Sequence, residues 1–138
     1  MEAAARLPNA TVHGRLSNNQ LASLYQRAAL LCCTSRLEGF PTSFLEAWSL
    51  GIPVVTTFDP DQIVARHGLG VVVTTQDELI AALRYLMQDK TQHEGFSGAA
   101  RRYYLENHTV EIISHRFRDE LEQLLRTACA MTPAPSLT

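Results

Sequence analysis

Hydrophobic and polar positions follow one another along the chain in blocks that predict a strand, a turn, a helix and a second strand. An apolar run from Ala28 to Cys33 leads into a polar turn that contains Gly39 and Pro41. Residues 42–50 have helical spacing and end at Gly51, and a second apolar run, residues 53–55, comes directly afterwards. Parallel strands need a crossover helix of this kind. We therefore expect a parallel α/β sheet with a ligand crevice beyond the carboxyl ends of its strands.

Upstream of this unit, the pattern predicts one more strand and one more helix. Residues 11–14, Thr-Val-His-Gly, form a short strand candidate that ends in a glycine. Ser17 and Gln20 have the spacing of a capping box, and apolar side chains follow them at helical spacing. We expect an amphipathic helix packed on the sheet, and a structural role for Tyr25 within its apolar stripe. Residues 2–7 carry helix formers that stop at a proline, which predicts the tail of an earlier helix.

Downstream, turn and capping signals predict a buried strand and three further helices. Gly68-Leu-Gly70 is a turn into the β-branched run 71–75, which is typical of a buried strand. Helix starts are predicted at the pairs Thr75/Glu78 and Thr91/Glu94 and at Thr109. From Thr109 an apolar face persists for several turns, so we expect a closing helix that covers the core. These elements predict a parallel α/β fold with about four strands, in one domain over residues 8–130, followed by a disordered tail over residues 131–138.

Composition narrows the class of protein. The chain has 138 residues, 46% of them apolar and 19% charged, with a net charge of −2, which is typical of a soluble globular domain. Lysine and arginine are scattered, so nucleic acid is not an expected partner. No stretch approaches about 18 consecutive apolar residues, so we expect no transmembrane segment. Cys32, Cys33 and Cys129 fit neither a metal site nor a disulfide framework, and we expect buried thiols in a cytoplasmic protein.

The turn before residue 42 has the chemistry of an anion and hydroxyl site. The first N–H groups of a helix lack partners within the helix, and its dipole adds positive charge, so residues 42–45 suit a diphosphate. Gly39 lets a ligand approach the backbone, while Pro41 lacks only an N–H that would be unpaired in any case. Glu38 and Glu46 have seven residues between them. Each carboxylate is a natural acceptor for a pair of sugar hydroxyls.

The run Glu38-Gly-Phe-Pro-Thr-Ser-Phe-Leu-Glu46-Ala, followed by Gly51-Ile-Pro-Val-Val-Thr, resembles the E-x7-E signature of GT-B retaining glycosyltransferases of group 1 or family 4 type. The resemblance implies a site for a UDP- or GDP-linked sugar in the carboxyl-terminal, Rossmann-like domain of a two-domain enzyme. No metal or other cofactor would be needed, since the nucleotide sugar is itself a substrate. On the family pattern Glu38, the catalytic candidate, would hold donor-sugar hydroxyls, Glu46 the ribose hydroxyls, and Leu45 would lie near the nucleoside.

The resemblance also implies further donor-binding residues. The backbone of the segment Gly39, Phe40, Pro41, Thr42 and Ser43 would contact sugar and diphosphate, and Gly14 would lie against the nucleobase. Arg15 and Arg36 are candidates for neutralising the diphosphate, although Arg36 also fits a solvated surface position. After the second strand, the family has two glycines and a glutamate where this chain has Phe58 and two aspartates. Here we expect Asp59 or Asp61 to act as a helix N-cap.

Two functional hypotheses stay open at this stage. The family's usual amino-terminal domain and its Gly-x-Arg…Lys loop have no match in this sequence, so we expect the chain alone to be a poor catalyst. It would then be the donor-binding part of a glycosyltransferase, completed by a separate amino-terminal domain. The alternative is a stand-alone, non-catalytic module that binds a nucleotide weakly or forms a homodimer through an uncovered sheet edge.

Overall fold

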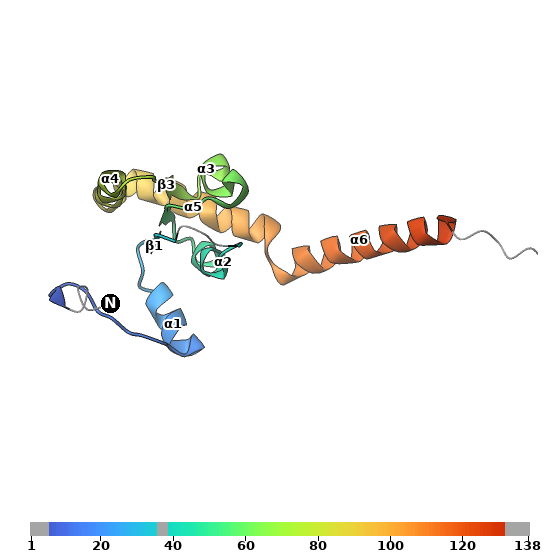
Figure 1. Ribbon diagram of the computed structural model, residues 1–138, viewed down its shortest axis with the longest axis horizontal. Helices are drawn as coiled ribbons and strands as arrows, with labels where there is room; N and C mark the ends of the chain where they lie inside the picture. The colour runs from blue at the N-terminus through green and yellow to red at the C-terminus, as the bar shows by residue number, and fades with distance from the viewer. Residues whose placement is uncertain (1–5, 36–38, 132–138) are drawn as a thin grey trace, which may run out of the picture.

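A three-stranded parallel sheet lies at the centre of the described part of the chain. The computed structural model describes residues 6–35 and 39–131. Strands β1 (Leu31–Cys33), β2 (Val54–Thr56) and β3 (Gly70–Val72) lie side by side in that order. The register pairs Leu31 with Val54, and Val54 with Gly70. The crossover from β1 to β2 contains a helix, so the predicted strand, turn, helix and strand unit is confirmed (Figure 1).

Seven helical elements accompany the sheet among the described residues. They are α1 (Asn18–Tyr25), α2 (Thr42–Ser49), η2 (Pro60–Gln62), α3 (Ile63–His67), α4 (Gln76–Gln88), α5 (Lys90–Asn107) and α6 (Val110–Met131). Capping boxes begin two of them as predicted. The side-chain oxygen of Gln20 accepts the Ser17 N–H at 3.0 Å, and the Thr75 hydroxyl accepts the Glu78 N–H at 3.2 Å.

The core lies on both faces of the sheet because alternate residues of β2 point in opposite directions. Val54 belongs to the larger cluster, which α2, α3 and α5 complete. Val55 belongs to the smaller cluster, where it meets side chains of α4. The central strand is therefore covered on both sides. This fixed strand sets the position of α2 and of the turn that precedes it.

The sheet has fewer strands than the pattern predicts. Residues 11–14 form no strand, so the described sheet has three strands where we expected about four. A strand needs a hydrogen-bonding neighbour, and no described strand lies beyond β1 to supply one. Strand β1 is therefore at an edge of the described sheet. Cys32 is exposed where we expected a buried thiol. Cys33 is half-buried.

Two capping predictions are resolved by the structure. The Asp59 carboxylate accepts the N–H groups of Val64 at 2.8 Å and Ala65 at 3.1 Å, so Asp59 and not Asp61 caps α3. The predicted capping box at Thr91 and Glu94 is wrong. Helix α5 already begins at Lys90, and its cap is Asp89, whose carboxylate accepts the Gln92 N–H at 3.0 Å. Asp89 also ends α4, so the two helices meet at a single residue.

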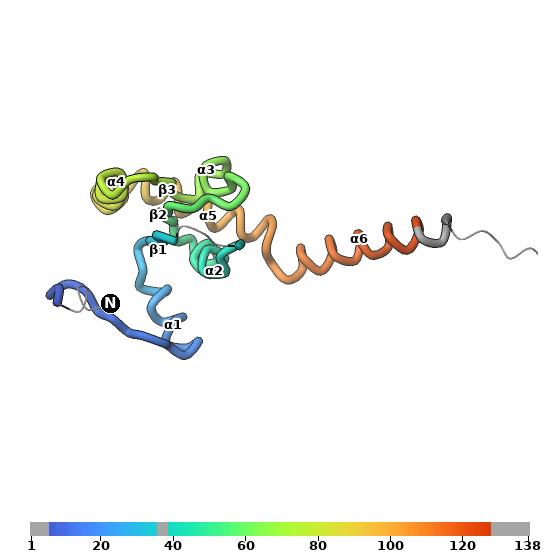
Figure 2. The backbone as a smooth tube through the Cα atoms, in the orientation of Figure 1, coloured from blue at the N-terminus to red at the C-terminus, as the bar shows by residue number. Residues whose placement is uncertain are grey.

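Helix α6 begins after Thr109 as predicted, but it does not cover the core. It extends away from the sheet (Figures 1 and 2), and its apolar side chains are between 44% and 77% exposed. These side chains are Val110, Ile113, Phe117, Leu121, Leu124 and Leu125. Helical periodicity predicted the stripe correctly, but it does not specify the surface that the stripe meets.

Several predictions concern the ends of the chain. Met131 is still helical, which moves the start of the predicted tail, and residues 132–138 lie outside the described residues. Residues 2–5 of the predicted amino-terminal helix also lie outside them. Among the described residues, no helix combines the length and the apolarity needed to cross a membrane.

Candidate functional site

The turn between β1 and α2 presents an open helix start. Pro41 is the N-cap residue, with extended backbone angles, and the first helical bond runs from the Phe44 N–H to the Pro41 carbonyl oxygen at 3.0 Å. Thr42 is exposed and Ser43 half-buried. Their N–H groups precede the helical bonding pattern, and they lie at the positive end of the helix dipole.

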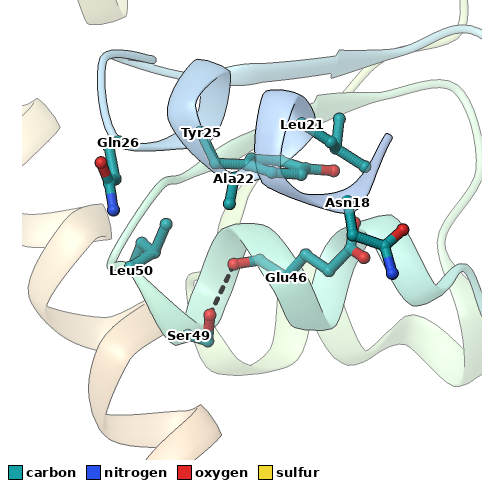
Figure 3. A pocket seen from close by; sticks show the side chains of 8 residues that line it. All are labelled: Asn18, Leu21, Ala22, Tyr25, Gln26, Glu46, Ser49 and Leu50. Carbon is teal, nitrogen blue, oxygen red and sulfur yellow. Dashed lines mark hydrogen bonds between the residues drawn. The ribbon is translucent and has the colours of Figure 1, made fainter. Parts of the chain in front are cut away.

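One turn further along, Glu46 opens onto a cavity between α1 and α2. The cavity measures about 290 Å³. It is lined by Asn18, Leu21, Ala22, Tyr25, Gln26, Glu46, Ser49 and Leu50. Figure 3 shows the Glu46 carboxylate extending toward Asn18, with the Tyr25 side chain above it. A carboxylate, an amide and a phenol therefore share a cavity whose other walls are largely apolar.

Tyr25 is coupled to Glu46 within this cavity. Burial raises the pKa of Tyr25 to about 12, and the neighbouring Glu46 carboxylate adds to the rise. The phenol therefore keeps its proton across the neutral range. We expected a structural role for Tyr25, and the structure also places it in the wall of the Glu46 cavity.

Asn18 and Tyr25 were not predicted as site residues. With Ala22 they occupy positions i, i+4 and i+7 of α1, and positions with this spacing lie on one face of a helix. That spacing was the available signal. It shows that the residues share a face, but only the packing of α1 beside α2 shows that the face meets Glu46.

The other predicted site residues are distributed unevenly. Glu38 and Arg36 lie outside the described residues. Gly39 and Thr42 are exposed at the turn, and Leu45 is half-buried against the core. Gly14 and Arg15 are exposed ahead of α1, and neither is among the described residues that line the Glu46 cavity. The structure thus brings Glu46 and the start of α2 together, while Gly14 and Arg15 stand apart from the cavity.

Aromatic rings back the turn on its inner side. The Phe40 ring packs edge-on against Trp48, with the ring centroids 6.2 Å apart, and at a tilt against His108, with the centroids 5.9 Å apart. Tyr103 contacts both Trp48 and His108, at centroid distances of 5.5 Å and 5.3 Å. Trp48 Nε1 and His108 Nε2 are buried without a hydrogen-bond partner in the described structure.

Metal ligands do not gather among the described residues of the site. No group of three or more His, Cys, Asp or Glu residues within the described ranges is arranged to hold a metal ion. Metal independence of any reaction at the site stays a prediction.

Comparison with known proteins gives one family. The family model described as "Glycosyl transferases group 1" matches residues 2–103, which include β1, α2 and every residue that lines the Glu46 cavity. No curated protein and no solved structure gave a match.

Proposed function

This chain belongs to the group 1 glycosyltransferases, and we propose that it forms the donor-binding part of a retaining enzyme of the family 4 type. The donor is a UDP- or GDP-linked sugar, and the sugar passes to an acceptor held by a separate amino-terminal domain. The observation that carries the proposal is the position of Glu46. Its carboxylate opens onto a cavity one helical turn from the N–H groups that begin α2.

The donor would lie with its diphosphate at the start of α2 and its ribose at Glu46. The N–H groups of Thr42 and Ser43 donate to phosphate oxygens, aided by the helix dipole. Both oxygens of Glu46 accept hydrogen bonds from the ribose diol, and the Tyr25 phenol lies in the same cavity. Asn18 can both donate and accept, and so it suits the polar edge of a base. The apolar walls of the cavity would cover the faces of the base and ribose.

The chemistry of transfer explains why positive groups matter here. Retaining transfer passes through an oxocarbenium-like transition state, and negative charge accumulates on the departing diphosphate. Oriented N–H donors stabilise that charge because they need no reorganisation when it develops. In this proposal Glu38 holds the donor sugar, and Arg36 supplies further positive charge. Such charges govern the rate of sugar transfer, so turnover in this chain can be slow. We still expect binding of the donor to be measurable.

Titration calorimetry with UDP, GDP and their glucose and mannose conjugates tests the proposal. We expect saturable binding of one nucleotide and its conjugate. Replacing Glu46 with alanine removes charge-assisted hydrogen bonds, each worth about 1.5–3 kcal/mol, so affinity should fall by about tenfold or more. Glu106→Ala is the matched control, since Glu106 is exposed and does not line the cavity. Equal affinities in the wild type and Glu46→Ala, or silence from every nucleotide, would refute the proposal.

One observation favours a second candidate, a dimerising module without catalysis. Strand β1 is at the edge of the described sheet, and Cys32 on it is exposed. Unpaired N–H and C=O groups on an edge strand are a template for pairing with another chain. Sedimentation equilibrium decides this candidate. A dimer that dissociates when proline replaces Cys32 supports it, and a monomer at all concentrations excludes it.

A further inference from the structure

The turn before α2 is packed against the junction between α5 and α6, which lies more than sixty residues further along the chain. Phe40 makes this contact. Its ring is 40% exposed, and its packed side meets Trp48 with the ring planes inclined by 73° and His108 with the planes inclined by 36°. Trp48 is fixed in the core of the molecule, where it is fully buried. The second contact, with His108, joins Phe40 to a distant part of the chain.

His108 is held in place by the residues around it. It ends α5, and its N–H donates to the Tyr104 carbonyl oxygen at 2.8 Å. The adjacent Asn107 donates to the Tyr103 carbonyl oxygen at 3.0 Å and accepts from the Arg116 guanidinium at 3.1 Å. Since Arg116 belongs to α6, the junction is tied to both helices. The backbone of His108 is thus tied to α5, and its ring packs against Phe40.

The chemistry of the imidazole suits this supporting role. Its Nε2 atom is buried and has no hydrogen-bond partner in the described structure. Burial lowers the pKa of His108, and the positive charge of Arg116 lowers it further, so the ring is neutral at pH 7. A neutral aromatic ring packs against phenylalanine in the offset and tilted arrangements that aromatic pairs prefer. His108 contributes here as an aromatic surface and not as a charge.

We propose that His108 is a positioning residue of the donor site, which holds the Phe40 ring against Trp48 and thereby fixes residues 39–41 at the start of α2. This inference rests on the proposed function and extends it to a residue of the α5–α6 junction. Without the His108 ring, Phe40 retains its contact with Trp48 and loses the second ring contact. The turn then samples other conformations, and the N–H groups of Thr42 and Ser43 lose their fixed placement.

The test uses the full chain and three variants: His108→Ala, which removes the ring, His108→Phe, which keeps an aromatic ring, and His115→Ala as control. His115 is an exposed histidine on α6. Two quantities are measured for each protein. Hydrogen exchange reports the opening of backbone amides in residues 39–45, with those of β3 as internal reference. Calorimetry reports affinity for UDP and GDP.

We expect His108→Ala to accelerate exchange in residues 39–45 while β3 is unchanged. Affinity should fall about two- to twelvefold, the factor that one aromatic pair contributes. His108→Phe should restore both quantities to within about twofold of the wild type. His115→Ala should match the wild type in both measurements.

Three results would overturn the inference or separate it from the proposed function. If His108→Ala had the hydrogen-exchange rates and the affinity of the wild type, His108 would only be the residue that ends α5, and the inference would be wrong. Failure of His108→Phe to restore the wild-type values would exclude ring packing as the cause. If the wild type binds neither nucleotide, the proposed function fails, and exchange in residues 39–45 alone then decides whether His108 positions the turn.

Discussion

Gly70 is the position where the structure allows the sharpest stability prediction. It begins β3 and pairs with Val54 of the central strand. A Cβ added to Gly70 would lie 1.9 Å from the Val54 carbonyl oxygen and 2.7 Å from the Val54 nitrogen. Its φ of 156° adds to the difficulty. The obstacle is backbone, so no side chain can rotate to make room. We predict that Gly70→Ala is among the most destabilising single substitutions in the chain.

The magnitude follows from how far the strands would have to separate. Ordinary van der Waals contact begins at 3.4 Å, so the added carbon falls short of it by about 1.5 Å. Overpacking usually costs about 1–3 kcal/mol. Here it would also break the pairing of β2 with β3 between the two core clusters. We therefore expect the free energy of unfolding to fall by about 4 kcal/mol or more, a large part of the stability of an ordinary domain.

Two other glycines separate the steric effect from the effects of backbone conformation. Gly68 has a φ of 63°, and a Cβ there would meet nothing within 4 Å. Gly68→Ala should therefore cost only the left-handed conformation, about 1–2 kcal/mol. Gly95 lies inside α5, also with open space around it. Gly95→Ala should raise the free energy of unfolding by about 0.5–1 kcal/mol, because alanine favours the helix.

Urea unfolding followed by tryptophan fluorescence measures all three variants. Trp48 is the single tryptophan of the sequence, and it is fully buried on α2, so its emission reports the loss of the main core cluster. The expected order of stability is Gly95→Ala, wild type, Gly68→Ala and then Gly70→Ala. A Gly70→Ala protein that unfolds at the same urea concentration as Gly68→Ala would refute the steric reasoning.

Three further predictions concern titration, capping and α6. The pKa of His108 is lowered in the folded state, so the unfolded state takes up its proton first as the pH falls below about 6.5. A change from pH 7.5 to pH 5 should therefore lower the urea midpoint of the wild type more than that of His108→Phe. Asp59→Ala removes two cap bonds of α3 and should cost about 1–2 kcal/mol in urea unfolding, whereas Asp119→Ala, an exposed control on α6, should cost about 0.5 kcal/mol or less. Phe117→Ser should change the free energy of unfolding by less than about 0.5 kcal/mol, because Phe117 is 66% exposed, while Leu86→Ala, at a site 2% exposed, should cost about 2–5 kcal/mol; equal effects would show that α6 is packed in solution.

Local signals predicted the centre of the fold well. Gly51 and the apolar run after it determined where α2 ends and β2 begins, because a glycine stop and a buried strand are properties of the segment itself. The strand predicted at residues 11–14 had no such support. A strand of a few residues forms only beside a neighbour, and the neighbour is a tertiary fact that a local pattern does not contain.

The residues of the candidate site differ in the same way: local signals predict some of them, and tertiary packing determines the others. Glu46 could be named from the sequence because the role proposed for it depends on its distance along α2 from a turn. Asn18 and Tyr25 could not, since their contact with Glu46 depends on how α1 lies beside α2. His108 is further removed still, because it reaches the turn only through the packing of α5 against α2 and the ring of Phe40.

Helix α6 shows how a correct local prediction can leave its tertiary consequence open. Its periodicity determines the angular position of the apolar stripe, but burial of the stripe depends on a second surface. The other described residues cover little of the stripe. What does connect α6 to the rest of the molecule is the junction where Arg116 donates to Asn107 beside His108. A helix whose apolar stripe is exposed responds to whatever packs on it, and a rotation of α6 would act on this junction first. If His108 positions Phe40 as proposed, a change in the orientation of α6 should also change the conformation of residues 39–41.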